Sequence, residues 1–112
     1  MLTLDIDRAE VNYLYYVLKR LLNIGLGDYE CVVRASSSRR GYHVIVYGFD
    51  KNVKAIRKLY DDTQRIYYDE INEMLGKTTQ VLFTQKGHRK AVELYRGKLR
   101  DIIVQVKAKH SL

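Results

Sequence analysis

A run of hydroxyl and guanidinium side chains, SSSRRG at residues 36–41, stands between two strand-like stretches of this 112-residue chain. Hydrogen-bond donors and positive charge gathered at a turn suit a phosphate group, whose oxygens accept charge-assisted hydrogen bonds. The same composition is also ordinary for a solvated hairpin loop, and the sequence leaves that alternative open. The candidate phosphate-binding residues are the loop serines and arginines together with other basic and aromatic side chains: Arg34, Ser36, Ser37, Ser38, Arg39, Arg40, His43, Tyr47, Arg65, Lys86, Arg89 and Lys90.

A second set of residues could hold a metal ion. Asp5 and Asp7 alternate at the end of the first expected strand, which puts both carboxylates on one face. Carboxylate pairs of this kind can hold a divalent cation during nucleotidyl transfer. If Val44 and Val46 face the core, His43 shares the open face of the sheet with the two aspartates. The alternative catalytic set is therefore Asp5, Asp7 and His43 with Mg²⁺ or Mn²⁺, whereas the first hypothesis needs no cofactor.

This second set resembles the archaeo-eukaryotic primase family, whose palm carries an Asp-x-Asp strand and a Ser-Gly-x-Gly-x-His-like hairpin. The resemblance implies that Asp5 and Asp7 bind the metal ion. It also implies that Ser38, Gly41 and His43 contact the phosphate. That family needs a third acidic residue on a later strand, and the stretch expected to form this strand, TTQVLFTQKG, contains none. Metal-dependent catalysis is therefore the alternative to a binding function.

A longer pattern covers about a third of the chain. The sequence RxSSSxxGYHV at residues 34–44, followed by DDxxRIxxD at 61–69, looks like a pattern in small uncharacterised proteins of archaeal viruses and plasmids. Those proteins usually have a glycine where Arg39 or Arg40 stands here. The resemblance implies a mobile-element setting and no particular activity. In a functional arrangement, Arg34, Arg65 and the serine loop would converge on a phosphate; in a structural one, Asp62 caps a helix and Arg65 pairs with Asp69.

Hydrophobic periodicity predicts the elements that must position these residues. The order of elements matches a ferredoxin-like, RNA-recognition-motif-like split βαβ plan: an α+β fold with an antiparallel sheet, helices on one face and a C-terminal extension. Residues 1–112 form a single domain. We expect strands at 2–6, 29–35, 42–47 and 79–85, helices at 8–24 and 51–75 with a break at 61–63, a short helix at 88–95, and a strand at 102–107 unless the helix continues through 99–106.

Charge and composition narrow the class of partner. The net charge is +7, and eight of the 20 basic residues but only two of the 13 acidic ones lie in the segment 86–112. Such a surface favours nucleic acid, DNA rather than RNA, as the partner. The single cysteine, Cys31, excludes an internal disulfide, and no apolar run is long enough to span a membrane. The acidic start of the chain is unlike a signal peptide, so we expect a cytoplasmic protein, in the host cell if viral.

The sequence therefore predicts a basic nucleic-acid-binding protein of an archaeal virus or plasmid that binds phosphates through its serine–arginine loop and basic C-terminal segment. A reduced primase-like enzyme and a structural or assembly protein are the alternatives. A tyrosine-rich face or an unpaired sheet edge could also make a homodimer, since ten of the 112 residues are tyrosines.

Overall fold

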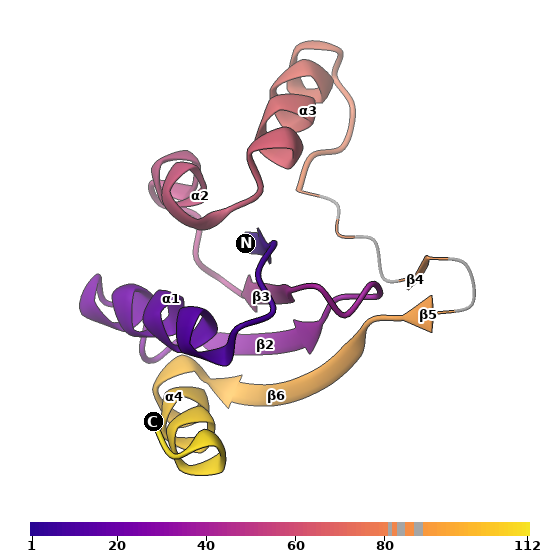
Figure 1. Cartoon of the computed structure of the whole chain (residues 1–112). Coiled ribbons are helices and arrows are strands. Elements are labelled where there is room, and N and C mark those ends of the chain that lie inside the picture. The colour runs from indigo at the N-terminus through magenta and orange to yellow at the C-terminus, as the bar shows by residue number, and fades with distance from the viewer. Residues whose placement is uncertain (81, 83–84, 87–88) are drawn as a thin grey trace.

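Four antiparallel strands form the central sheet in the order β1-β3-β2-β6 (Figure 1). The computed structural model describes residues 1–80, 82, 85–86 and 89–112, with the backbone alone for 85–86. The elements in chain order are β1 (Leu2–Ile6), α1 (Val11–Asn23), β2 (Glu30–Ala35), β3 (Tyr42–Val46), α2 (Val53–Tyr60), α3 (Thr63–Met74), β4 (Gln85–Lys86), β5 (Arg89–Lys90), β6 (Val92–Lys98) and α4 (Leu99–His110).

The predicted α+β class is confirmed. β3 lies between β1 and β2, as the split βαβ plan requires, and α1 and α4 pack side by side on one face of the sheet (Figure 1). Alternate residues of the strands face these helices because side chains along a strand point to opposite faces. The core that results is fully apolar: Leu2, Leu4, Ile6, Val33, Val44 and Val46 from the strands, and Leu14, Leu18, Leu21, Ile102 and Val106 from the helices.

The C-terminal third differs from the sequence prediction. The expected helix at 88–95 is wrong over its described part, because residues there form β5 and β6, and β6 pairs with the free edge of β2. Pairing with an edge that would otherwise lack partners overrides local helix propensity. The expected strand at 102–107 is also wrong. Its residues belong to α4, where the helical spacing of Leu99, Ile102, Ile103 and Val106 buries one stripe while Val104 stays 66% exposed.

Of three other expected boundaries, two differ from the prediction and one is confirmed. The first helix begins at Val11 rather than residue 8, and its N-cap is Glu10 without a side-chain cap bond, so Asp7 does not cap it. The expected break at 61–63 is confirmed, since α2 ends at Tyr60 and α3 begins at Thr63. Of the expected strand at 79–85, only Gln85 lies in a described strand, β4, which pairs with β5 outside the main sheet, and residues 81, 83 and 84 lie outside the described part.

The sheet face opposite α1 was expected to be open around His43, but this part of the face is covered. Thr3 of β1 is 1% exposed, and His43 and Ile45 of β3 are 3% and 7% exposed. Above the outer edge of β1 stand α2 and α3, with α3 set apart from α1 and α4 (Figure 1). Among the helices that the structure describes, none is long and apolar enough to cross a membrane.

Candidate functional site

One row of polar residues crosses three strands of the sheet. Asp5 of β1 lies opposite His43 of β3, which lies opposite Arg34 of β2. Directly opposed residues of neighbouring strands share a face, so all three side chains lie on the face turned away from α1. The Oδ1 atom of Asp5 is 3.8 Å from Nε2 of His43. The prediction that Asp5 and His43 share a face is thus confirmed, although this part of the face is covered rather than open.

Burial shifts the two titratable groups of this row in opposite senses. Desolvation raises the pKa of Asp5 to about 6; the charge of Arg65 opposes the shift, and the neighbouring carboxylates of Asp61, Asp62 and Asp7 reinforce it. Desolvation lowers the pKa of His43 to about 4, and the positive charges of Arg34 and Arg65 contribute. At neutral pH the row therefore holds a carboxylate beside a neutral imidazole. The buried Nδ1 atom of His43 has no hydrogen-bond partner among the described residues.

Gly41 fixes the distance between β1 and the loop that joins β2 to β3. A Cβ atom at this position would stand 1.8 Å from the backbone oxygen of Ile6, so only glycine allows the two segments to approach so closely. The consequence is that Asp7, the residue after Ile6, stands beside the serines of the loop. Asp7, Ser37 and Ser38 accordingly line the same hollow.

The loop at residues 36–41 is held by its own hydrogen bonds. Ser36 Oγ lies 3.3 Å from Ser38 Oγ, and the backbone N–H of Arg40 donates to Ser38 Oγ. Arg39 adopts a left-handed backbone conformation with φ of 60°, which is where glycine would be favoured. Its Nη1 donates to the backbone oxygens of Ser36 at 2.7 Å and Lys90 at 2.8 Å. Arg39 therefore ties the loop to β5. Both arginines are exposed, but the Arg40 guanidinium makes no hydrogen bond with a described residue.

The turn between α2 and α3 lies along the outer edge of β1. The backbone N–H of Asp5 donates to Asp61 Oδ1 at 2.7 Å, and the backbone N–H of Asp62 donates to the oxygen of Asp5 at 3.0 Å. These bonds bring the Asp62 carboxylate next to Asp5. Asp62 also caps α3, as predicted, by accepting from the Gln64 N–H at 2.8 Å.

Three adjoining hollows share Asp7, and together we call them the Asp7 groove. The first also contains Asp5, His43 and Asp62 and the serine loop. The second, of about 440 Å³, is lined by Ser37, Ser38, Arg40 and Arg89 as well as Asp7. The third has a volume of about 540 Å³. It is lined by Asp5, Asp7, Arg8, Tyr13, Tyr60, Asp61, Asp62, Thr63 and Gln64.

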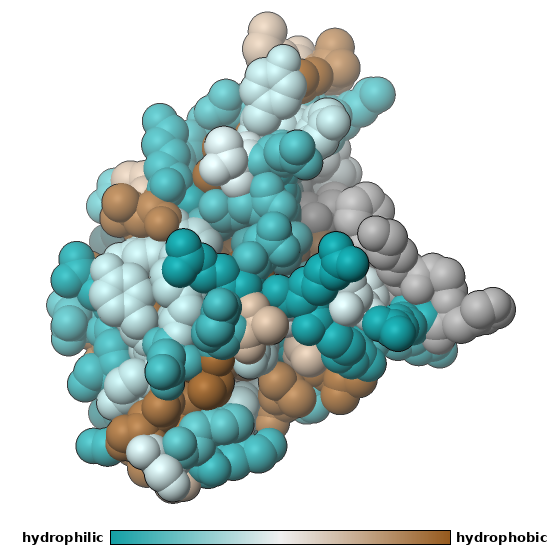
Figure 2. Space-filling view, in the orientation of Figure 1, coloured by the Kyte–Doolittle hydropathy of each residue, from teal (hydrophilic) through white to brown (hydrophobic). Residues whose placement is uncertain are grey.

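Figure 2 shows hydrophilic side chains over the middle of the face that carries β1 and the loop, and apolar ones at the far end of α3. Asp7 and Asp62 make no ion pair with any described residue, although arginines line the same groove. The described residues also contain no group of three histidine, cysteine, aspartate or glutamate side chains arranged to hold one metal ion.

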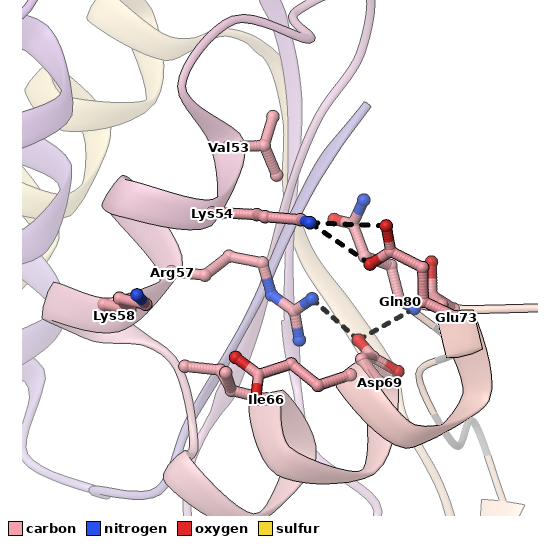
Figure 3. A pocket seen from close by; sticks show the side chains of 10 residues that line it. Val53, Lys54, Arg57, Lys58, Ile66, Asp69, Glu73 and Gln80 are labelled. Carbon is pink, nitrogen blue, oxygen red and sulfur yellow. Dashed lines mark hydrogen bonds and ion pairs between the residues drawn. The ribbon is translucent and has the colours of Figure 1, made fainter.

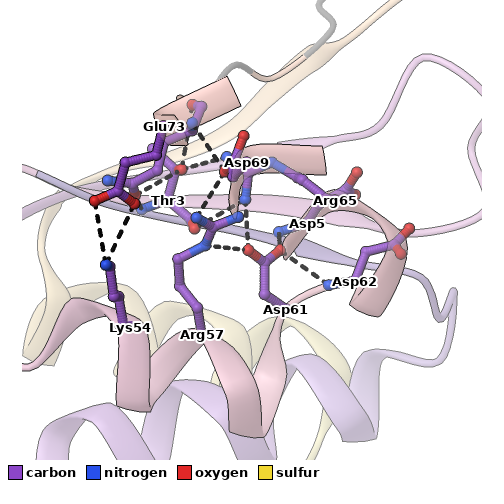
Figure 4. A network of polar contacts seen from close by, with 10 residues as sticks. Thr3, Asp5, Lys54, Arg57, Asp61, Asp62, Arg65, Asp69 and Glu73 are labelled. Carbon is purple, nitrogen blue, oxygen red and sulfur yellow. Dashed lines mark hydrogen bonds and ion pairs between the residues drawn. The ribbon is translucent and has the colours of Figure 1, made fainter. Parts of the chain in front are cut away.

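A different set of charges lies between α2 and α3. Arg57 and Asp69 form an ion pair of 2.6 Å, and Lys54 pairs with Glu73 at 3.2 Å (Figure 3). Figure 4 shows how this set continues to β1, where Asp61 accepts from Arg57 and from Arg65. We call Thr3, Arg57, Asp61, Arg65 and Asp69 the Asp61 network.

The predicted phosphate-binding residues divide between these two regions. Ser37, Ser38, Arg40 and Arg89 line the groove, whereas Arg65 donates to Asp61 and to the backbone oxygen of Thr3 in the network. Asp69, the predicted partner of Arg65, pairs with Arg57. The buried Nε of Arg34 has no partner among the described residues.

Two other predicted residues, Tyr47 and Lys90, do not line the groove. Tyr47 is 42% exposed just beyond the end of β3. Lys86 lies in β4, opposite Arg89, and Lys90 is exposed in β5. His43, by contrast, lines the first hollow of the groove but is only 3% exposed.

Several residues that line the groove were not predicted from the sequence, and three of them are basic or aromatic. Arg8, Tyr13 and Tyr60 reach it from the segment after β1, from α1 and from the end of α2. No local pattern marks them, because they meet only when α2 packs beside β1. Asp62 was identified only as a helix cap. No protein-family model, curated protein or solved structure matches this chain.

Proposed function

We propose that this chain is a nucleic-acid-binding protein, and that the Asp7 groove is where it holds the sugar–phosphate backbone. The observation that carries the proposal is the shared hollow of Ser37, Ser38, Arg40 and Arg89. Two guanidinium groups and two hydroxyls facing one space supply the donors that a phosphate accepts. The net charge of +7 adds the long-range attraction that brings a polyanion to the surface. The resemblance of residues 34–69 to small proteins of archaeal viruses and plasmids supports a mobile-element setting.

The roles within the loop are unequal in this proposal. Arg40 is exposed and has no hydrogen-bonded partner for its guanidinium among the described residues, so it is available to a phosphate. Nη1 of Arg39 donates to two backbone oxygens, so Arg39 positions the loop rather than contacting the phosphate. Gly41 keeps Asp7 close to the loop, which limits how deeply a phosphate enters, since like charges repel.

The test compares two double variants for binding to a fluorescent oligonucleotide at several salt concentrations. Arg40→Ala with Arg89→Ala should weaken binding by about 1–3 kcal/mol, because charge-assisted contacts are lost. It should also reduce the dependence of log K on log salt by about 0.7–0.9 per lost contact. The control is Lys51→Ala with Lys58→Ala, which removes the same charge from exposed sites outside the groove and outside the basic C-terminal segment. Equal losses in both double variants would mean that binding is spread over the whole surface.

A second candidate function, metal-dependent nucleotidyl transfer, is favoured by one observation. Asp5, Asp7, Asp62 and His43 line a single hollow with the serine loop. Mg²⁺ is commonly held by one or two carboxylates together with substrate phosphates, so an incomplete set of protein ligands still fits this ion. Asp5 and Asp7 would hold the cation, which would supply charge stabilisation at the phosphate when bound. The wild-type protein should then incorporate nucleotides with Mg²⁺ or Mn²⁺, and no incorporation with either ion would reject this candidate.

A further inference from the structure

The third hollow of the Asp7 groove is built differently from the other two. Its walls carry aromatic rings: Tyr13 and Tyr60 line it, and Tyr16 lies between them, with ring centroids 5.9 Å from Tyr13 and 6.4 Å from Tyr60. The guanidinium carbon of Arg8 stands 4.5 Å from the centroid of the Tyr13 ring. This cation–π distance, with Arg8 exposed and Tyr13 half-buried, leaves the pair accessible to solvent, and we call it the Arg8–Tyr13 platform.

We propose that this hollow receives an unpaired base of single-stranded nucleic acid, stacked against the Arg8–Tyr13 pair. This inference rests on the proposed function, since the neighbouring hollow would hold the phosphates of the same strand. Aromatic rings and guanidinium planes are the surfaces on which proteins stack unpaired bases. A base inside a duplex cannot reach such a wall without leaving its stack, so the protein should prefer single strands.

The charges of the hollow favour a base over a phosphate. Three carboxylates, those of Asp5, Asp7 and Asp62, line it against the single guanidinium of Arg8. The fourth lining carboxylate, that of Asp61, is already paired with Arg57 and Arg65. That balance repels an anion, whereas a neutral base carries N–H groups, the imide N–H of thymine among them, that donate to carboxylates. Two uncharged side chains, the amide of Gln64 and the hydroxyl of Thr63, are present for the remaining edge atoms.

Position along the groove supports the same assignment. Asp7 belongs both to the aromatic hollow and to the hollow of Arg40 and Arg89. A nucleotide whose phosphate lies against the arginines can therefore extend its base past Asp7 toward Tyr13. The other tyrosine pair, Tyr67 and Tyr68 on α3, has a centroid distance of 6.0 Å and equal exposure of 61%, but it lines none of the hollows of the groove.

The first test needs no variant. A short fluorescent oligothymidylate, an oligomer of the same length with abasic sugars, and a duplex of that length are compared for binding to the wild-type protein. If one base stacks, the oligothymidylate should bind about 5- to 150-fold more tightly than the abasic strand. It should also bind more tightly than the duplex. Equal affinity for the base-bearing and abasic strands overturns the base site but leaves phosphate binding intact, whereas no binding to any of the three overturns the proposed function itself.

Variants then locate the base. Tyr13→Leu should bring the oligothymidylate to the affinity of the abasic strand, and Tyr13→Phe, which keeps the ring, should retain the preference. The control is Tyr68→Leu, which removes an exposed ring outside the groove and should leave the preference unchanged. A 2-aminopurine base in the strand should lose fluorescence on binding to the wild type and to Tyr13→Phe. If Tyr13→Leu keeps the full preference for bases, or Tyr68→Leu abolishes it, the Arg8–Tyr13 platform is not the site.

Discussion

The Asp61 network and the Asp7 groove lie on neighbouring parts of β1 and use the same residue types, yet their charges are satisfied to very different degrees. In the network, the side chain of Asp61 is fully buried and accepts from Arg57, Arg65 and the Asp5 N–H (Figure 4). In the groove, Asp7 is exposed and makes no ion pair with a described residue. A buried charge is stable only when it is paired or hydrogen-bonded, whereas an exposed charge is solvated by water and remains available to a ligand.

Because their charges are paired to different degrees, the network and the groove serve different purposes. β1 is an edge strand, and its outer edge is covered by side chains: Asp61 accepts from the Asp5 N–H, Gln80 accepts from the Thr3 N–H, and Arg65 donates to the Thr3 oxygen. Covering an edge in this way satisfies its backbone groups and prevents pairing with another chain. The network thus stabilises the strand from which Asp5 and Asp7 reach the groove.

The largest expected effect comes from removing the centre of the network. Asp61→Ala leaves Arg57 and Arg65 buried without their shared carboxylate, and such a loss typically costs about 3–5 kcal/mol. The midpoint of urea unfolding should fall accordingly. The matched control is the next residue: Asp62→Ala removes a helix cap in the groove and should cost about 1 kcal/mol. If Asp61→Ala and Asp62→Ala lower the free energy of unfolding by similar amounts, the network contributes no more to stability than an ordinary helix cap.

A smaller effect is expected where the groove is joined to the sheet. Gly41→Ala places a Cβ 1.8 Å from the Ile6 oxygen, so the backbone must move, at a cost of about 1–3 kcal/mol. The movement separates Asp7 from the serine loop and should weaken oligonucleotide binding as well. Thermal unfolding and fluorescence anisotropy measure the two consequences. A variant that is destabilised but binds normally would mean that Gly41 serves only the fold.

Much of the groove could be predicted because its parts are marked by local signals. The period of two around Asp5 and Asp7 placed them at and just after the end of β1, and SSSRRG predicted the loop between β2 and β3. The sheet face shared by Asp5 and His43 followed from the same alternation.

The network and the C-terminal elements could not be predicted, for physical reasons that differ. Asp61 was predicted only as part of a helix break, and Arg65 as a partner of Asp69 or of a phosphate. Their buried role appears only when α2 and α3 meet β1. Ile102, Val104 and Val106 alternate as in a strand, yet the helical stripe that includes Leu99 and Ile103 buries more apolar surface. Residues 92–98 form a strand because β2 offers an edge, which no local propensity reports.

A third prediction uses the opposed titrations of Asp5 and His43, the two groups at the border between groove and sheet. The pKa of Asp5 is raised from 3.8 to about 6, so in this interval the folded protein binds the proton more tightly and acidification stabilises it. The pKa of His43 is lowered from 6.5 to about 4, so acidification through that interval destabilises the fold. The two contributions oppose each other in the wild type.

Single variants should expose each contribution. From pH 7 to pH 4, Asp5→Asn should lose stability, since only the His43 contribution remains, and His43→Gln should gain it. A change on the order of 1–2 kcal/mol relative to the wild type is expected after allowance for the partial exposure of Asp5. Urea unfolding at several pH values measures these slopes, which do not depend on any constant offset in stability. Parallel slopes for the two variants would contradict the opposed titrations.

The smallest effect on stability, and the sharpest distinction between the two candidate functions, is expected for Asp7→Asn. Asp7 is exposed and unpaired among the described residues, so the variant should unfold within about 0.5 kcal/mol of the wild type. If the groove binds phosphates without a metal, removing this negative charge beside Arg40 and Arg89 should strengthen oligonucleotide binding slightly. If the groove works with Mg²⁺, binding in its presence should weaken instead, because one carboxylate ligand is lost.

Anisotropy titrations with Mg²⁺ and with EDTA distinguish metal-free phosphate binding from metal-dependent binding. The control is Asp50→Asn, which changes an exposed carboxylate that does not line the groove. A variant that binds like the wild type under both conditions would place Asp7 outside the binding site and leave the groove no different in function from the network beside it.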